Sequence, residues 1–398
     1  MTKLESNDHA MTDNAGQFAH AMLPKMTADE LARQQFVKSF KLHIATQIAP
    51  GNKDVYNAKV LPEYQKKHGR APANRHEVRK EMQRQGYYQI WSALLRSSQE
   101  LMWKSCQLPV ERQLPELIKL AQTAGSDYST LALDPDLEIP AYHRAVDIHC
   151  QPGGYHTEVA PNDVAAGAIY DRAVYIYAMG RMGPFNDDIG ASAVAYLQQS
   201  KPDFRPKRIL DLGCTVGHST IPYVDAYPDA EIHAIDVAAP VLRYAHARAE
   251  SLQKPIHFSQ QNAENMNYED GYFDLIVSHI LVHETSSKAF RNIMSECQRL
   301  LAPDGWVIHG ETPPYKDMDP YDAFMLDWDT YNNNEPFWGA SHEIDPMAVA
   351  EKFGFRQDSV FEAMAPSAFE AADADRTHVF QGGDFGGGGM WYLYGMQK

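Results

Sequence analysis

The segment from Arg208 to Thr220 constrains the fold of this chain more than any other. Its start, 208–212, is typical of a buried strand, and Gly213 and Gly217 after it are typical of a tight turn that leads into a helix. Glycine lets the backbone bend without a Cβ clash and approach a ligand closely, while the first N–H groups of the next helix face the same place. The segment therefore predicts an α/β fold with a ligand site after this strand.

The glycine spacing narrows the class of ligand. A dinucleotide fingerprint that begins at Gly213 needs glycine at the positions of Thr215 and His218, so pyrophosphate binding is disfavoured. A second predicted strand, 231–235, ends on Asp236, about 20 residues after the turn, where a carboxylate can accept hydrogen bonds from both ribose hydroxyls. We expect a nucleoside-bearing ligand, and the alternative is an ordinary strand–turn–helix.

The turn resembles motif I of the class I S-adenosylmethionine (SAM) dependent methyltransferases, D-x-G-x-G-x-G, with Thr215 in place of the middle glycine. The elements after it follow the order of that family: helix 240–252, strand 256–258, a loop at 261–266 like the family's adenine loop, strand 273–279, a helix capped by Ser286 or Ser287, strand 306–311, helix 346–353, and strands 359–363 and 390–396. The resemblance covers about 184–398. It implies an α/β, Rossmann-like, seven-stranded sheet, mostly parallel with an antiparallel last strand, preceded by an α-helical N-terminal domain.

The resemblance also implies SAM as the cofactor, S-adenosylhomocysteine as the product, and a set of cofactor-binding residues. Asp236 is expected to hold the ribose, Asn262 the adenine amino group in place of the usual Asp, and the backbone N–H of Ala263 a ring nitrogen. Tyr170, Tyr177 and Arg181 are candidates for the methionine end, with core packing as the alternative for both tyrosines. The full set is Asp211, Gly213, Cys214, Thr215, Gly217, Asp236, Val237, Asn262, Ala263, Glu264, Ser278, Tyr170, Tyr177 and Arg181.

The loop after strand 273–279 is where a general base would lie beside the transferred methyl group. We predict His283 as this base, with Glu284 orienting it and His279 as the second candidate. Such a base contributes roughly 10²- to 10⁴-fold to a rate. In the alternative interpretation, His283 stacks on the cofactor or caps the next helix.

A length of 398 residues suggests about two domains. We expect a flexible tail over 1–23, a mainly helical domain over 24–180 that covers the substrate, mediates dimerisation, or both, and a methyltransferase domain over 181–398. The predicted helices of the second part are one that opens with a capping box at 27–30 and ends at Pro50–Gly51, one over about 75–106 with Gly86 as a weak point, and one over 109–123.

Two further segments carry chemistry. Residues 143–158 include His143, His149, Cys150, His156 and Glu158, but the spacing matches no zinc signature, so we expect a substrate-facing loop without metal, and a metal site is the less favoured alternative. Asn162 is expected to cap the helix that follows. An aromatic insertion over 312–345 could line an apolar pocket, and the alternative is a satellite hydrophobic cluster.

Composition limits the partners and the location. The net charge of −16 disfavours a nucleic-acid substrate, which normally requires a basic face. The amino terminus has no apolar run long enough for a signal peptide or membrane span, so we expect a cytoplasmic protein with no membrane association. The cysteines form no C-x-x-C pair and are expected to be reduced: Cys106, Cys150, Cys214 and Cys297.

The sequence thus predicts a SAM-dependent methyltransferase that acts on a small molecule, with O-methylation slightly ahead of N-, C- or S-methylation, and leaves a homodimer open. One alternative is a methyltransferase that acts on a protein side chain or a nucleic acid. A second is a non-catalytic module that binds SAM for regulation or assembly. A third is a related fold that catalyses another reaction, such as a cyclisation, because fold alone does not determine function.

Overall fold

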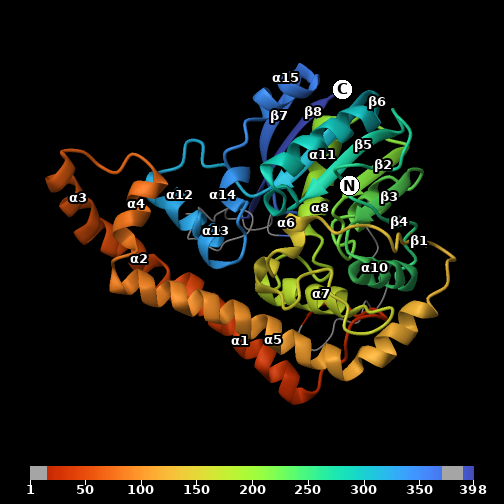
Figure 1. Ribbon diagram of the computed structural model, residues 1–398, viewed down its shortest axis with the longest axis horizontal. Helices are drawn as coiled ribbons and strands as arrows, with labels where there is room; N and C mark the ends of the chain where they lie inside the picture. The colour runs from red at the N-terminus through yellow and green to blue at the C-terminus, as the bar shows by residue number, and fades with distance from the viewer. Residues whose placement is uncertain (1–15, 370–388) are drawn as a thin grey trace, which may run out of the picture.

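The N-terminal part of the chain is helical and runs along one side of the molecule (Figure 1). The computed structural model describes residues 16–369 and 389–398. The helices of this part are α1 (Ala28–His43), a π-helical turn (Ile44–Ile48), α2 (Pro50–Val55), a second π-helical turn (Tyr56–Val60), α3 (Leu61–His68), α4 (Arg75–Met82) and α5 (Gly86–Gln122). Within the described ranges, no helix combines the length and the apolar character needed to cross a membrane.

Two predicted helix ends in this part are wrong. Pro50 does not end the first helix, because it stands at the start of α2, where its missing N–H is not needed. The predicted break between Cys106 and Pro109 is absent, and α5 continues through Pro109. Proline leaves the carbonyl four residues earlier without its helical donor, and here the side chain of Gln34 on α1 donates to that carbonyl, of Ser105, at 3.1 Å. A tertiary contact thus replaces the lost local one.

One sheet forms the centre of the rest of the chain. Its strands lie in the order β1-β4-β3-β2-β5-β6-β8-β7. Their bounds are β1 (Thr130–Ala132), β2 (Arg208–Leu212), β3 (Glu231–Asp236), β4 (His257–Gln260), β5 (Phe273–His279), β6 (Leu301–Glu311), β7 (Arg356–Pro366) and β8 (Met390–Gln397). The last strand, β8, is antiparallel to both neighbours, as predicted.

Among the described residues the sheet has eight strands, so the predicted number of seven is wrong. The extra strand, β1, pairs in parallel with β4, with Thr130 opposite His257. Three residues at a sheet edge, with an exposed–intermediate–exposed pattern, give no periodic sequence signal. Only the pairing with β4 defines β1 as a strand.

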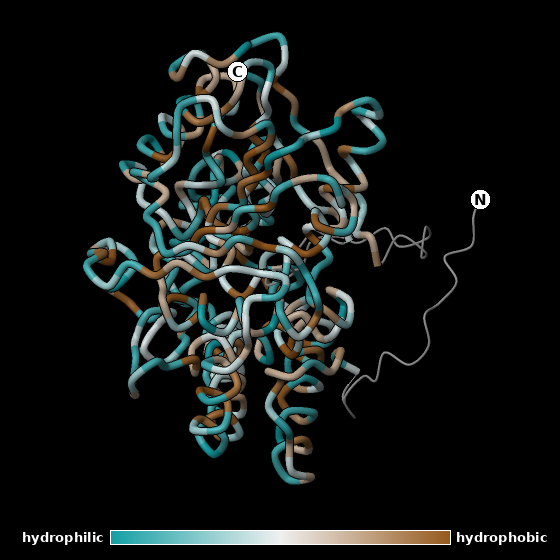
Figure 2. Tube along the Cα trace, turned by 90° about the vertical axis from the view of Figure 1, so that its right-hand side faces the viewer, coloured by the Kyte–Doolittle hydropathy of each residue, from teal (hydrophilic) through white to brown (hydrophobic). Residues whose placement is uncertain are grey.

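Helices cover both faces of the sheet. Ile209 and Leu210 are adjacent in β2 and both fully buried, because one faces α8 and α10 and the other faces α11 and α15. The most hydrophobic stretches of the chain accordingly lie in the middle of the molecule (Figure 2). The helices of this region are α6 (Ala141–Arg144), a 3-10 turn (Ile148–Cys150), α7 (Ala165–Tyr177), α8 (Asp188–Ser200), α9 (Ile221–Ala226), α10 (Ala239–Ser251), a 3-10 turn (Val282–Glu284), α11 (Ser287–Leu300) and α15 (Pro346–Phe353).

The aromatic insertion contains three short helices, α12 (Pro320–Leu326), α13 (Trp328–Asn332) and α14 (Trp338–Ser341). Phe324 and Trp328 pack with Tyr88 and Trp91 of α5, with ring centroids 5.2 Å apart for Tyr88 and Phe324 and 5.9 Å apart for the two tryptophans. The insertion therefore forms a satellite cluster with the N-terminal helices, as in the alternative interpretation.

Only the second part of the predicted tail is described in the structure. Residues 1–15 of the tail expected over 1–23 lie outside the described residues. Residues 16–23 are described, and Gln17 and Met22 are buried. Asn162 does not cap the helix that follows, because α7 begins at Ala165 with Val164 as its N-cap, and the side chain of Asp163, one residue earlier, accepts the N–H of Ala165 at 2.7 Å.

Candidate active site

The turn after β2 has the geometry that its glycines predict. The N–H groups of Gly213 and Cys214 donate to the carbonyl of Ile235 on β3, at 2.8 and 3.0 Å. Gly213 has a φ of +68°, and a Cβ at this position would lie 2.6 Å from Leu281 Cδ1. Thr215, which stands where motif I has its middle glycine, also has a positive φ, of +45°. The backbone at Thr215 therefore keeps a glycine-like conformation without glycine.

Asp236 ends β3 beside this turn. One oxygen of its carboxylate accepts the N–H of Thr215 at 3.0 Å, and the other accepts the N–H of Ala238 at 2.9 Å. Burial raises the pKa of Asp236 to about 6. Because a carboxylate offers about four acceptor positions, Asp236 keeps acceptor capacity for a hydroxyl group of a ligand.

A pocket lies at the carboxyl ends of β2, β3 and β5, where a doubly wound α/β sheet binds its ligands. The rest of its lining comes from α5, from the segment 142–155 and from α7. Most of the residues predicted for cofactor binding or catalysis line this pocket: Tyr170, Tyr177, Asp211, Gly213, Cys214, Thr215, Asp236, Val237, Asn262, Ala263, His279 and Glu284.

Other predicted residues do not line the pocket: Arg181, Gly217, Glu264, Ser278 and His283. Ser278 is buried in β5 and contacts His309 Nδ1 at 2.7 Å. Glu264 accepts a hydrogen bond from Asn292 Nδ2 at 2.8 Å. Gly217 shapes the turn, with a φ of +78°. The binding roles of these residues stay predictions.

His283 and Glu284 differ in access to the pocket. The imidazole of His283 is fully buried, with Nδ1 at 2.9 Å from Glu311 Oε2. Glu284 lines the pocket, and its Oε1 lies 2.7 Å from His149 Nε2. Burial alone raises the pKa of Glu284, but His149 and His283 outweigh it and lower this pKa. The geometry therefore brings Glu284 to the pocket and leaves His283 behind it.

His149 is the functional candidate that the predicted catalytic set lacks. It lies between two carboxylates, with Nε2 beside Glu284 and Nδ1 2.8 Å from Glu335 Oε1. Burial lowers the pKa of His149, but Glu335 and Glu284 outweigh it and hold this pKa well above its usual value. The three residues come from segments far apart in the sequence, so no local spacing could have joined them.

Two more histidines line the pocket. His279 Nε2 contacts the hydroxyl of Tyr223 at 3.0 Å, and its Nδ1 lies 3.5 Å from Asp211 Oδ1. Burial lowers the pKa of His143 to about 4, so this imidazole is neutral at pH 7. Its Nε2 is buried and has no hydrogen-bond partner among the described residues. His143 is therefore a polar group available to a ligand on an otherwise largely aromatic wall.

Asp171 on α7 connects the turn to the chain's N-terminal segment. Its carboxylate contacts Gln17 Nε2 at 2.9 Å, His20 Nε2 at 2.9 Å, His218 Nε2 at 2.8 Å and the Tyr244 hydroxyl at 2.9 Å. Burial raises the pKa of Asp171, but His218, Arg248 and His20 outweigh it and hold this pKa well below its usual value. The carboxylate thus fixes His218, which follows Gly217 and lines the pocket.

Comparison with known proteins agrees with this geometry. A family model described as a methyltransferase domain matches residues 209–305. The demethylmenaquinone methyltransferase of Thermus thermophilus is 30% identical over 176 residues, which cover 42% of this chain and 71% of that protein. The malonyl-[acyl-carrier protein] O-methyltransferase of Halorhodospira halophila is 30% identical over 109 residues, which cover 27% of this chain and 36% of that protein.

Among solved structures, a Haemonchus contortus phosphoethanolamine N-methyltransferase 2 in complex with SAM matches with a TM-score of 0.39 and 16% identity, covering 57% of each chain. The strand order, the turn and the matched relatives together define the class of protein. The chain belongs to the class I SAM-dependent methyltransferases. It is a methyltransferase, and SAM is its cofactor.

The residues of the pocket fit this cofactor. One wall of the pocket is formed by the backbone at Gly213, which has no Cβ, by the carboxylate of Asp236 and by the loop at Asn262 and Ala263. Asn262 already uses its side-chain oxygen to accept the N–H of Glu264 at 2.9 Å, which fixes the loop. A nucleoside would therefore meet a preformed surface.

Proposed function

We propose that this enzyme methylates a small molecule that binds inside the pocket. The supporting observation is that Met102 and Trp103 of α5, Tyr155 and Tyr170 line the pocket together with the turn. These bulky side chains leave room for a small molecule beside the cofactor and favour it over a macromolecular substrate. Such a largely apolar wall with few polar groups suits a compact organic acceptor.

We assign the cofactor to the wall that carries the turn. Asp236 would hold the ribose hydroxyls, Asn262 and Ala263 the adenine, and the turn at Gly213 would leave room for the methionine portion. Asp211 is held by the Thr220 hydroxyl at 2.6 Å and keeps the turn in shape. Bound there, SAM would supply a methyl group on a positively charged sulfur for transfer to the acceptor.

The chain's own contribution is alignment, exclusion of water and removal of a proton. Positioning alone contributes on the order of 7–11 kcal/mol in favourable cases. Glu284 and His279 line the pocket and are the predicted catalytic residues that can contact an acceptor, whereas His283 supports Glu284 from behind. Two proton-accepting groups near the reacting centre favour an acceptor that loses a proton, and we place O-methylation slightly ahead of N-methylation.

We also propose that residues 24–180 act as the cover of this pocket. Trp103 on α5 donates from Nε1 to the carbonyl of His149 at 2.6 Å, so the helical part holds the segment that faces the acceptor. A second copy of the chain could add to this cover, and light scattering of the purified protein measures whether a homodimer forms.

The experiment that tests the proposal uses SAM labelled on its methyl group. The purified protein is incubated with labelled SAM and a cell extract that has been separated into metabolite and macromolecular fractions. Label in one metabolite, whose mass increases by one methyl group, supports the proposal. Label in protein or nucleic acid alone overturns it, and saturable SAM binding without transfer favours the non-catalytic module.

A further inference from the structure

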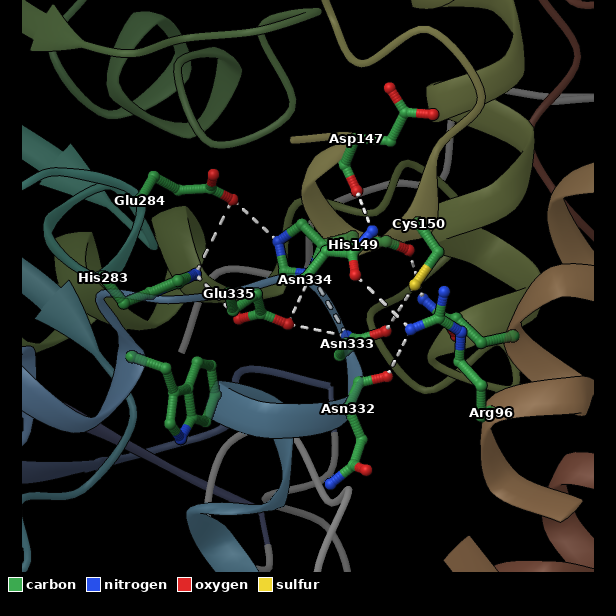
Figure 3. A network of polar contacts seen from close by, with 12 residues as sticks. Arg96, Asp147, His149, Cys150, His283, Glu284, Asn332, Asn333, Asn334 and Glu335 are labelled. Atoms are coloured by element: carbon green, nitrogen blue, oxygen red, sulfur yellow. Dashed lines mark hydrogen bonds and ion pairs between the residues drawn. The ribbon is translucent and has the colours of Figure 1, made fainter. Parts of the chain in front are cut away.

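Three segments bring metal-ligating side chains together beside the pocket (Figure 3). His149 lies in the 3-10 turn Ile148–Cys150, His283 in the turn Val282–Glu284, and Glu335 in the insertion between α13 and α14. One donor atom from each lies within 4.8 Å of the other two. Glu284 lies next to them and faces the pocket.

His283 has the contact pattern of an imidazole that ligates a metal. Its Nδ1 is fixed by Glu311, at 2.9 Å, as metal-binding histidines are commonly fixed by a carboxylate on the other ring nitrogen. Its Nε2 is buried and has no hydrogen-bond partner among the described residues. Glu335 Oε2 is buried without a partner as well, and it lies 3.9 Å from that nitrogen.

These two unpartnered atoms need an explanation, because leaving a buried polar group unsatisfied costs about 1–3 kcal/mol. A direct hydrogen bond does not explain them, since 3.9 Å is too long. Donors that each lie about 2.0–2.2 Å from one metal ion are about 3–4 Å apart. The separation of His283 Nε2 and Glu335 Oε2 therefore suits an ion between them.

The surroundings fix the other donors in the same way. Asn333 Nδ2 donates to Glu335 Oε1 at 2.6 Å. His149 has a φ of +52°, an unfavourable backbone conformation for this residue, and its carbonyl accepts hydrogen bonds from Trp103 Nε1 and Gln99 Nε2. These hydrogen bonds thus hold His149 in a positive-φ conformation in which its imidazole lies in the cluster.

The charge of the cluster is also unbalanced. Glu284, Glu311 and Glu335 are buried or nearly so, and the ion-pair partners found for them among the described residues are His149 and His283. Buried carboxylates without arginine or lysine partners are commonly neutralised by a bound cation.

We propose that His149, His283 and Glu335 bind a divalent first-row transition-metal ion, with Glu284 beside it at the acceptor end of the pocket. Two imidazoles and one carboxylate form a donor set used for zinc and for ferrous iron with open positions, and disfavour magnesium and calcium. Where the proposed function holds, the ion would act on the acceptor through His149 and Glu284, which line the pocket, whereas His283 and Glu335 do not. This inference departs from the sequence-based expectation of no metal.

The test measures metal binding directly on the full-length enzyme. The protein is stripped with a chelator, dialysed and titrated with Co²⁺, Zn²⁺, Mn²⁺ and anaerobic Fe²⁺, and the bound metal is measured by mass spectrometry and by the visible absorption of Co²⁺. We expect about one ion per chain for at least one of these metals. His283→Ala and Glu335→Gln should each weaken binding by at least about tenfold, and Glu311→Gln by about 10- to 100-fold.

The matched control is His246→Ala. His246 on α10 is a buried histidine whose Nε2 also has no partner in the described part of the chain, but it lies outside the cluster, so its loss should leave the bound metal unchanged. Circular dichroism checks that each variant folds. If the wild-type chain binds none of the four metals, the proposal is wrong whether or not the variants fold. Calorimetry with S-adenosylhomocysteine tests the cofactor site separately, so the two failures are distinguishable.

Discussion

Replacing Asp236 by Asn tests the assignment of the ribose site. The substitution keeps the size of the side chain but removes the charge and one acceptor oxygen. In the structure one oxygen accepts the N–H of Thr215 and the other the N–H of Ala238, so an amide nitrogen at either place would meet a donor. The variant should therefore lose affinity for S-adenosylhomocysteine and also loosen the turn.

The size of the loss follows from the bonds involved. A hydrogen bond to a charged group contributes about 1.5–3 kcal/mol, and the amide retains one acceptor. We expect a loss of about 2–3 kcal/mol of binding free energy, which corresponds to a roughly 30- to 150-fold higher Kd. The wild-type affinity should also fall as the pH decreases from 7 to 5, because Asp236, with a pKa of about 6, takes up a proton in the free protein and then accepts hydroxyl groups poorly.

Isothermal titration calorimetry with S-adenosylhomocysteine measures both effects. Asp274→Asn is the control, because Asp274 also accepts two backbone N–H groups, of Lys207 and Arg208, at the opposite end of the parallel strands. It should bind the ligand as the wild type does. A folded Asp236→Asn protein whose Kd stays within threefold of the wild type at pH 7 would refute the assignment.

Three further predictions concern stability and reactivity. Asp171→Ala should lower the free energy of unfolding by about 3–5 kcal/mol in chemical denaturation, because it removes a buried charge with several partners. The folded-state pKa of Asp171 is depressed, so the stabilisation by its carboxylate is present above the unfolded-state pKa of about 4 and should be lost as the pH falls below that value. Gly190→Ala should lower the melting temperature, since the added Cβ would lie 2.3 Å from the carbonyl oxygen of Ser219. Gly86→Ala is the control: the added Cβ would have no described atom within 4 Å, so the melting temperature should stay unchanged or rise by a few degrees. All four cysteines are buried, so the native protein should react with a thiol reagent only after denaturant is added; fast reaction of the native protein would contradict the packing.

The core elements were predictable because their signals are local. The predicted strand over 273–279 coincides with β5, and the predicted helix over 346–353 coincides with α15. Ser286 caps α11 through its own side chain, which accepts the N–H of Ala289. A strand buried on both faces gives a continuous apolar run, and a cap is decided within four residues.

Elements that depend on distant partners were missed. The continuation of α5 through Pro109 depends on Gln34, and β1 exists only because it pairs with β4. The site shows the same difference between residues located by local signals and residues that depend on distant partners. The turn and Asp236 follow one another along the chain, so the family motif locates them. The neighbours of His149 and the exclusion of His283 from the pocket arise only when separate segments fold together.

The wall supplied by α5 and the segment 142–155 lies outside residues 209–305, the part of the chain that the family model matches. If this wall selects the acceptor, as proposed, the cofactor turn and the acceptor specificity can be inherited separately. A chimera that joins residues from the N-terminal side of one such enzyme to the sheet of another should keep its methyl donor and change which compound it modifies. Relatives aligned through the shared segment alone thus carry little information about the compound that this enzyme modifies.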